Sequence, residues 1–317
     1  MAPDSSTLSS ICVGIVCIVT VRKVLPWLYT NIIGPIFLGS RIDFRRFGAW
    51  AVVTGATDGI GKAYAKALAK KGLNVVLISR SLSKLAAVAK EITDAHNVQI
   101  KIIDIDFTDG PQIYQKIEKN ITGLDIGVLV NNVGISYLYP EFFIEYITRY
   151  PQFLRDIISV NIHSVTNMCG LVLPNMIAKK KGVIINLSST AAVIPYSLLS
   201  VYSGTKAFVD KFSVDLQTEY RNQGIIVQSV QPGFVATNMA KIRKSTLLAP
   251  SPDTYVASAL KTVGIARQTA GYLPHALLQL RIHLLGAVAG DQMARNFIFN
   301  FFSGMRKRAL RNSEKKK

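Results

Sequence analysis

Two alternating sequence periods dominate the region between about residues 45 and 290. Short apolar runs rich in β-branched residues are followed by longer segments of helical spacing, which is typical of strands and helices in turn. The expected strands are AWAVVTG, LNVVLISR, VQIKIIDIDF, LDIGVLVNN, GVIINLSS and IIVQSVQPG. Because each is apolar on both faces, they fit a parallel sheet that helices cover on both sides. The alternation therefore predicts one α/β domain with a doubly wound parallel sheet.

A glycine-rich segment follows the first expected strand directly. It reads TGATDGIG and covers residues 54–61. Gly55, Gly59 and Gly61 permit a tight turn and let backbone N–H groups approach a pyrophosphate at the start of the next helix. Glycines alone are weak evidence, but their place between the first strand and the first helix favours dinucleotide binding. The expected fold is therefore of the Rossmann type.

The end of the second expected strand indicates which dinucleotide is bound. NAD-binding proteins usually carry an Asp or Glu there, which holds the ribose 2′-hydroxyl. This chain has Ser79 and Arg80 instead. A guanidinium can pair with a 2′-phosphate that a carboxylate would repel, so the sequence favours NADPH (NADP) as the cofactor. Arg80 as an ordinary exposed residue at a helix start is the alternative.

Tyr202 and Lys206 lie four residues apart in VYSGTKAFVDKF, on one face of an expected helix. A solvated helix face can show the same pair, so the spacing alone leaves both interpretations open. Ser189 and the glycine turn end two other strands, and strand carboxyl ends form the crevice where open α/β sheets bind ligands. This placement favours Tyr202 as a proton donor and Lys206 as the cation that lowers its pKa.

The N-terminus has the composition of a membrane anchor. Residues 5–21 carry no charge, and Arg22 and Lys23 follow them, which places the rest of the chain in the cytosol. A cleaved signal peptide is the alternative, but the acid in the head MAPDSS disfavours it. We therefore expect an anchor and interfacial segment over residues 1–44 and the dinucleotide-binding domain over residues 45–290.

An apolar, basic extension ends the chain, with an amphipathic tail expected over residues 291–317. From Arg306 onward there are seven Lys or Arg residues and one Glu, which suits an anionic membrane surface or a solvated tail equally. The net charge of +18 is also compatible with binding to nucleic acid. Because the basic residues cluster beside apolar segments and form no recognised motif, we expect membrane lipid as a partner and no nucleic acid.

Neither a disulfide framework nor a metal site is expected. The three cysteines form no CxxC pair, and the four histidines are scattered without ligand spacing. Reduced thiols packed as small apolar groups are the favoured interpretation.

Together these motifs resemble the short-chain dehydrogenase/reductase family over nearly the whole expected domain. The family's glycine turn corresponds to residues 54–61, and its NNAG motif to residues 131–134, where Val133 replaces the alanine. Its Pro-Gly…Thr segment corresponds to residues 232–237. One departure is Asp58, which stands where some NADP-preferring members carry a basic residue. The cofactor preference therefore rests on Arg80.

The resemblance also implies roles for the site residues. Tyr202 and Lys206 are the implied catalytic residues. Ser189, rather than its neighbour Ser188, is implied to orient the ketone. Asn161 is expected to kink its helix and to hold a water that relays protons to Lys206. Asp106 is expected beside the adenine, with helix capping as an equal alternative. The residues implied in cofactor binding are Gly55, Thr57, Asp58, Gly59, Ile60, Gly61, Arg80, Asp106, Asn132, Gly134, Tyr202, Lys206, Pro232, Gly233, Val235 and Thr237.

A closer resemblance concerns the membrane-bound very-long-chain 3-oxoacyl-CoA reductases, a group also described as 17β-hydroxysteroid dehydrogenases. It rests on WAVVTGATDGIGKAYA, LVNNVGISYLYPEFF, GFVATNMAKIRK and TAGYLPHALLQL. The resemblance implies NADPH-dependent reduction of 3-oxoacyl-CoA during fatty-acid elongation in the endoplasmic reticulum. Other elongation enzymes and a second copy of the chain are the implied partners. A steroid dehydrogenase and a non-catalytic membrane scaffold are the alternatives.

Overall fold

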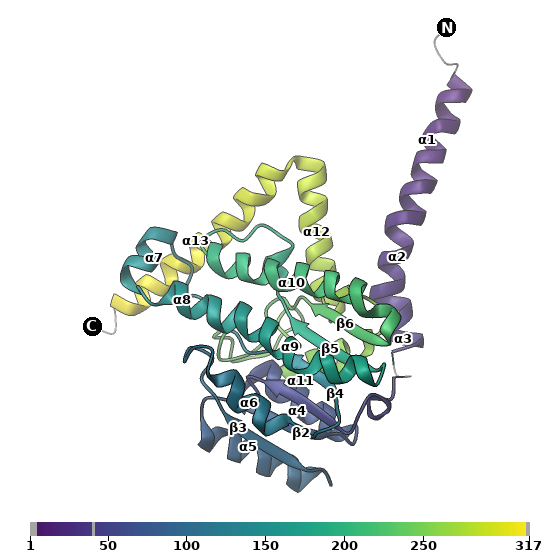
Figure 1. The fold of residues 1–317 in the computed structure, drawn as a ribbon. Helices are drawn as coiled ribbons and strands as arrows, with labels where there is room; N and C mark the ends of the chain where they lie inside the picture. The colour runs from purple at the N-terminus through teal and green to yellow at the C-terminus, as the bar shows by residue number, and fades with distance from the viewer. Residues whose placement is uncertain (1–4, 40–41, 315–317) are drawn as a thin grey trace.

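The computed structural model describes residues 5–39 and 42–314, so Lys315 to Lys317 of the basic tail lie outside the described part. Its centre is a parallel sheet of seven strands in the order β3-β2-β1-β4-β5-β6-β7 (Figure 1). The strands are β1 Trp50–Thr54, β2 Asn74–Ser79, β3 Ile100–Asp104, β4 Ile126–Asn131, β5 Gly182–Leu187, β6 Ile225–Val230 and β7 Gln268–Thr269. The predicted Rossmann-type sheet is confirmed, and the six expected strands are β1 to β6.

Strand β7 was not expected from the sequence. It has two residues, and Gln268 is exposed, so it lacks the apolar run that marks the other strands. It pairs with β6 through Ser229 and Val230 at the edge of the sheet. Its position therefore depends on β6 rather than on its own composition.

Helices cover both faces of the sheet. The helices of the domain are α4 Gly59–Lys70, α5 Leu82–Ala95, α6 Ile113–Ile121, α7 Phe143–Arg149, α8 Phe153–Ile158, α9 Ser164–Ala178, α10 Ser200–Tyr220 and α11 Pro252–Ala259. Residues of α4, α5 and α11 share one apolar cluster with one face of the strands. Residues of α6, α9 and α10 share a second cluster with the other face. Both faces of the sheet are therefore buried, as the apolar strands require.

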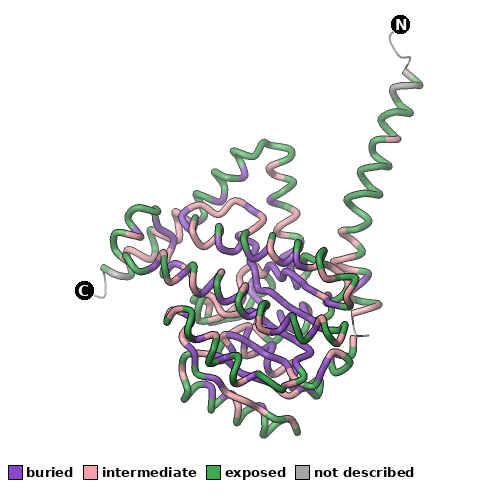
Figure 2. The backbone as a smooth tube through the Cα atoms, in the orientation of Figure 1, coloured by how far each residue is buried: buried purple, intermediate pink, exposed green. Residues whose placement is uncertain are grey.

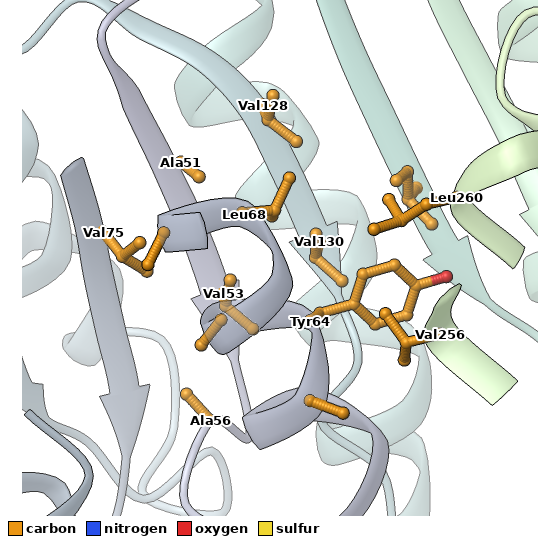
Figure 3. Packing of buried hydrophobic residues seen from close by; sticks show 14 of the residues in the cluster. Ala51, Val53, Ala56, Tyr64, Leu68, Val75, Val128, Val130, Val256 and Leu260 are labelled. Carbon is orange, nitrogen blue, oxygen red and sulfur yellow. The ribbon is translucent and has the colours of Figure 1, made fainter. Parts of the chain in front are cut away.

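Helix α4 shows how the first of these faces is closed. Its alanine-rich side lets the backbone come close to β1 and β4, with Leu68 and Tyr64 filling the space above the strand valines (Figure 3). Val256 and Leu260 close the same cluster from the α11 side. Leu68 is fully buried. This helix begins at the glycine turn, so its packing also fixes the position of that turn.

The N-terminal segment begins clear of the domain and ends against it (Figure 1). It consists of α1 Ser5–Val19, α2 Leu25–Leu28 and α3 Gly34–Phe37, joined by π-helical turns η1 Thr20–Val24 and η2 Tyr29–Ile33. Residues Ser9–Phe37 form a helix long and apolar enough to cross a membrane, with none of its most apolar window buried. A second stretch, Phe153–Ala178, passes the same test but is half buried. Because that stretch packs on the sheet through α9, we assign it to the domain core.

The C-terminal region folds back onto the domain as a helical hairpin, α12 Leu273–Ala289 and α13 Asp291–Glu314. Ile282, Ala294, Ile298 and Phe302 from the hairpin are buried against aromatic residues of the segment 137–153. Arg306 forms an ion pair with the buried carboxylate of Glu141. The aromatic loop at 137–146 thus contributes to a third apolar cluster.

Replacement of Leu68 by alanine tests the packing of α4. We expect Leu68→Ala to lower the free energy of unfolding by about 2–5 kcal/mol, because it leaves a cavity between α4 and the sheet. Leu82→Ala is the matched control, since Leu82 is 55% exposed at the start of α5. Denaturant unfolding in detergent measures both. Equal losses in the two variants would contradict the packing described here.

Candidate active site

The residues expected to form a site follow the carboxyl ends of different strands. Gly55 follows β1, Arg80 follows β2, Asp106 follows β3 and Asn132 follows β4. Because the strands are parallel, these ends meet at one edge of the sheet, on either side of the point where the strand order reverses. A cavity of about 410 Å³ opens there. Its lining includes Gly55, Thr57, Asp58, Gly59, Ile60, Arg80, Asp106, Asn132, Gly134, Tyr202, Lys206, Pro232 and Thr237.

The glycine turn forms one wall of this cavity. Gly55 and Gly59 have φ angles of 65° and 53°, a conformation that favours glycine. The side-chain amide of Asn132 donates to the carbonyls of Thr54 and Gly55 at 3.0 and 3.2 Å. A Cβ on Gly61 would overlap that amide, so Gly61 lies behind the turn rather than in the cavity. Hydrogen bonds from Asn132, at the end of β4, therefore hold the glycine turn in position.

Asp58 has a structural contact that accounts for an acid in the turn. Its carboxylate caps α4 by accepting from the Gly59 N–H at 2.7 Å. The other carboxylate oxygen accepts from the side-chain amide of Asn238 at 2.7 Å. Asp58 thus ties the turn to the segment that follows Thr237, so its negative charge is engaged by donors of the chain itself.

Arg80 lies at the far end of the cavity from Tyr202, on a different strand end, and its side chain is 72% exposed. Its guanidinium is 3.8 Å from the carboxylate of Asp106, a surface pair that contributes little to stability. Asp106 also accepts from the backbone and side chain of Thr108, so it caps the turn after β3. Asp106 lines the cavity, which leaves the adenine contact a prediction, but the helix-capping alternative is wrong, because α6 begins at Ile113 and Asp106 caps only the turn after β3.

Tyr202 and Ser189 meet at the opposite end. Burial raises the pKa of Tyr202 above its ordinary value, and a hydrogen bond with the Ser189 side chain partly opposes this. The Ser189 hydroxyl also accepts from the Ala191 N–H at 3.1 Å, which orients it. Ser188 has a different role, because its hydroxyl donates to the Lys206 carbonyl at 2.7 Å and fixes α10 to the end of β5. Ser188 also lines the cavity and Ser189 does not, but the hydrogen bond with Tyr202 is made by Ser189, so the choice of Ser189 stays a prediction.

Burial outweighs any lowering of the Tyr202 pKa by Lys206, so the net direction is upward, contrary to the expectation from spacing. Its Nζ lies 5.9 Å from the Tyr202 ring centroid and donates to the Leu187 carbonyl at 2.8 Å. Burial lowers the pKa of Lys206 itself to about 8. The helical spacing correctly placed the two side chains on one face of α10. It did not reveal that the Lys206 ammonium would donate to the carbonyl at the end of β5.

Asn161 lies in a π-helical turn, η4 Ser159–His163, between α8 and α9. Its amide accepts from the Ile135 N–H at 2.8 Å and donates to the Ile135 carbonyl at 3.0 Å. It also donates to the Thr205 hydroxyl at 3.0 Å, next to Lys206 on α10. A Cβ on Gly134 would lie 3.4 Å from both the Asn161 amide oxygen and the Lys206 ammonium. Asn161 therefore joins the end of β4 to the helix of Tyr202.

Comparison with known proteins agrees with this geometry. A sequence model of the family described as short chain dehydrogenase matches residues 49–247. The chain belongs to this family. Very-long-chain 3-oxoacyl-CoA reductase-A of Danio rerio is 56% identical over 233 residues, which cover 74% of this chain and 72% of that protein. The Rattus norvegicus very-long-chain 3-oxoacyl-CoA reductase is 48% identical over 270 residues, 85% of each chain.

Solved structures share the fold of this short-chain dehydrogenase. A short-chain dehydrogenase from Sphingobium yanoikuyae, in complex with NADPH, is 29% identical and has a TM-score of 0.61, covering 67% of this chain and 82% of that one. A 7beta-hydroxysteroid dehydrogenase has a TM-score of 0.72 over 81% of this chain and 99% of its own, at 21% identity. The second likeness concerns the fold alone.

Sequence reasoning missed one residue of this dehydrogenase, His275, which it counted only among four scattered histidines. The side chain is fully buried at the start of α12. Its Nδ1 accepts from the Gly233 N–H at 3.2 Å, while Nε2 faces the carbonyls of Phe234 and Leu248 at 3.1 and 3.2 Å. These contacts require the tautomer with the proton on Nε2. His275 thus fastens both ends of the segment 233–248, which includes Val235 and Thr237.

Substitutions of His275 test this fastening. We expect His275→Phe to weaken NADPH binding about tenfold while the chain stays folded, because one buried N–H and two carbonyls lose their partner. His275→Asn, which keeps an acceptor near the Nδ1 position, should recover part of the affinity. His283→Phe is the control, since His283 is exposed on the same helix and contacts only the Val193 carbonyl in the described chain. Fluorescence titration with NADPH measures all three, and unchanged affinity in His275→Phe would contradict the role.

The pKa of Lys206 predicts an alkaline limb in the activity. Since Lys206 is protonated below about pH 8 and neutral above it, kcat/KM for NADPH should fall as the pH rises through that value. Lys206→Arg keeps its charge to higher pH, so any remaining activity should lack this limb. Initial rates across the pH range check it. A profile of the unsubstituted enzyme that stays flat well above pH 8 would refute the assignment.

Proposed function

We propose that this short-chain dehydrogenase reduces very-long-chain 3-oxoacyl-CoA to 3-hydroxyacyl-CoA with NADPH, and that Tyr202 is the proton donor. The observation that carries the proposal is the shared cavity: the glycine turn and Arg80 line one part, and Tyr202 and Lys206 line the other. The relatives named very-long-chain 3-oxoacyl-CoA reductase support the substrate class.

The cavity residues fit a dinucleotide phosphate. The glycine turn at the start of α4 would receive the pyrophosphate, because Gly55 and Gly59 line the cavity and have no side chain to keep a phosphate away from the backbone. Arg80 would hold the 2′-phosphate, and Gly134 leaves space beside Lys206 for the nicotinamide ribose. When bound, NADPH supplies the hydride that reaches the C3 carbon of the ketone.

The chain supplies the proton and the placement. Because burial keeps the pKa of Tyr202 above its ordinary value, the phenol holds its proton at neutral pH and can release it to the ketone oxygen as negative charge develops there. Ser189 hydrogen-bonds the Tyr202 hydroxyl, so a ketone oxygen that contacts both is oriented within reach of the proton. Lys206 is largely protonated at that pH, and its charge stabilises the phenolate that remains.

Roles for the remaining site residues follow from their contacts. Asn161 holds the backbone after Gly134 and, through Thr205, the helix of Lys206, so we assign it a positioning role in addition to the expected proton relay. Gly233 and Val235 are not part of the cavity lining, so their expected role in cofactor binding would be indirect, through the segment whose ends His275 fastens. Pro232 and Thr237 line the cavity directly.

A steroid ketone is the second candidate substrate. The apolar cluster beside Tyr202 includes Tyr196, Phe234 and Phe302, with the rings of Tyr196 and Phe302 4.6 Å apart. None of the three lines the cavity itself, but an apolar surface beside Tyr202 suits a flat steroid as well as an acyl chain. A non-catalytic scaffold is disfavoured, since it would not need Ser189, Tyr202 and Lys206 in mutual reach.

The proposal also covers the location of the chain and its partners. We place the chain in the endoplasmic reticulum membrane with the domain in the cytosol, because Arg22 and Lys23 stand on the domain side of an exposed apolar helix. Other fatty-acid elongation enzymes are proposed as partners on the strength of the substrate class. A homodimer is proposed through α9 and α10, where Phe208 is exposed and its ring stacks with that of Phe212.

A substrate panel tests the activity. Purified protein in detergent is incubated with NADPH and, separately, a very-long-chain 3-oxoacyl-CoA, a 17-ketosteroid and an ecdysteroid ketone, and the loss of NADPH absorbance is followed. We expect rapid turnover of the acyl-CoA, reduced at least about a thousandfold in Tyr202→Phe because the proton donor is gone. Turnover of a steroid with an inert acyl-CoA would overturn the proposed substrate and leave the mechanism standing.

The cofactor preference has its own test. Arg80→Ala should lower kcat/KM for NADPH by roughly tenfold to a hundredfold, the effect of one charge-assisted pair, and leave kcat/KM for NADH nearly unchanged. Lys84→Ala is the control, because Lys84 is an exposed cation on α5 outside the cavity lining. Equal losses with both cofactors would show that Arg80 does not read the 2′-phosphate.

A further inference from the structure

The hairpin of α12 and α13 carries an apolar stripe that no other described element covers. Leu277, Leu284 and Val288 on α12 are 44%, 52% and 87% exposed. On α13, Met293, Phe297 and Phe301 recur every four residues and are 53%, 56% and 46% exposed. Figure 2 shows that the outer surface of the hairpin is largely exposed up to its apex. So many large apolar side chains on one element indicate a contact surface.

The stripe is presented by a firmly packed element. The opposite side of the hairpin, including Ile298 and Phe302, is buried in the third apolar cluster. The Glu141–Arg306 ion pair fastens α13 to the segment before α7, and the Arg306 guanidinium also lies 5.2 Å from the Phe142 ring centroid. The exposed side chains therefore have a fixed direction relative to the sheet and do not belong to a loose tail.

The direction of the hairpin coincides with that of the N-terminal helix. Figure 1 shows that α1 and the α12–α13 apex rise from the same side of the domain. At their bases the two elements touch, because α12 contacts η2. Gly34 is buried at this junction, and a Cβ there would lie 2.7 Å from Ile265. The end of the candidate span is thus seated on the domain beside α12.

The length of the candidate span sets the level of a membrane surface. Its 29 residues, Ser9–Phe37, extend about 44 Å as a helix, against a hydrocarbon core of about 30 Å. The span is therefore longer than the core, and Arg22 and Lys23, near its middle, mark the cytosolic surface proposed above, so α2, η2 and α3 fall on the domain side of that surface. In Figure 1 the hairpin apex reaches beyond α2 to the level of α1, so it would enter the bilayer that α1 crosses.

The charges on the hairpin fit a lipid headgroup layer. Arg281, Lys307, Arg308 and Arg311 are exposed cations on these two helices. Asp291 is engaged by Arg295 at 2.7 Å, so the described hairpin surface has a positive balance. Long basic side chains can extend from an apolar face to phosphates, as Arg281 would within the α12 stripe.

We propose that the α12–α13 hairpin is a second membrane-docking element, which inserts its apex into the same leaflet that α1 enters and places its cations among lipid phosphates. The occupant of the stripe is a lipid surface. This inference rests on the proposed membrane anchoring, and it adds a consequence for the substrate: the inner side of the hairpin packs on Ile194 and Leu198, which lie in the chain between Ser189 and Tyr202. The substrate side of the cavity then faces the bilayer.

Depth measurements in lipid test the docking. Val288→Cys, Phe297→Cys, Val13→Cys and Leu82→Cys are made in the full chain with Cys12 and Cys17 replaced by serine, and labelled with an environment-sensitive fluorophore. Cys169 is buried and can stay. The proteins are placed in vesicles of phosphatidylcholine and phosphatidylserine that contain nitroxide-labelled acyl chains. We expect quenching at position 288 close to that at position 13, weaker quenching at position 297, and none at position 82, which lies on α5.

The outcomes separate the two proposals. Quenching at position 13 without quenching at position 288 would overturn hairpin docking and leave the anchor intact, whereas no quenching at position 13 would overturn the anchor. Val288→Asp provides a second test without a label at the apex. It should reduce quenching at position 297 at least about twofold while leaving the melting temperature in detergent unchanged, because the Val288 side chain is 87% exposed. Undiminished quenching at position 297 would count against insertion of the apex.

Discussion

The hydrogen bonding of β1 to both β2 and β4 is the constraint on which the rest of the structure depends. It reverses the strand order at the centre of the sheet, so the loops after β1 and β4 diverge and leave a cavity between them. The glycine turn lies on one side of this point. Asn132 and Gly134 lie on the other, where Asn132 reaches back to the turn and Gly134 lies beside Asn161 and Lys206. The pairing of β1 with both β2 and β4 thus brings the expected cofactor-binding residues and the proton donor to the same cavity.

Neutral polar clamps, rather than ion pairs, hold the site in place. The amides of Asn132 and Asn161 and the imidazole of His275 each join two backbone segments, and all three are buried or half-buried. Such contacts position the chain without adding charge beside the phenol of Tyr202. The one cation at the proton donor, Lys206, keeps a pKa near neutrality because it is buried. The fold therefore determines at which pH Lys206 loses its proton.

Local sequence patterns predicted the parts of the fold and site that depend on local chemistry. Strands β1 to β6 are apolar runs, Tyr202 and Lys206 follow helical spacing, and the glycines mark a turn that requires positive φ. Features that depend on contacts between distant segments could not be predicted from the sequence. His275 acquires its partners only when α12 packs on the segment 233–248, and β7 exists only beside β6. The Lys206–Leu187 bond, likewise, needs α10 against β5.

Transfer of deuterium from the cofactor to the substrate carbon tests the central claim most directly. NADPH carrying deuterium at the reactive position of the nicotinamide is supplied with a very-long-chain 3-oxoacyl-CoA, and the product is analysed by mass spectrometry. The account predicts a 3-hydroxyacyl-CoA with one deuterium at C3, formed by the unsubstituted enzyme and nearly absent with Tyr202→Phe. Product without deuterium at C3, or equal product from both proteins, would contradict it.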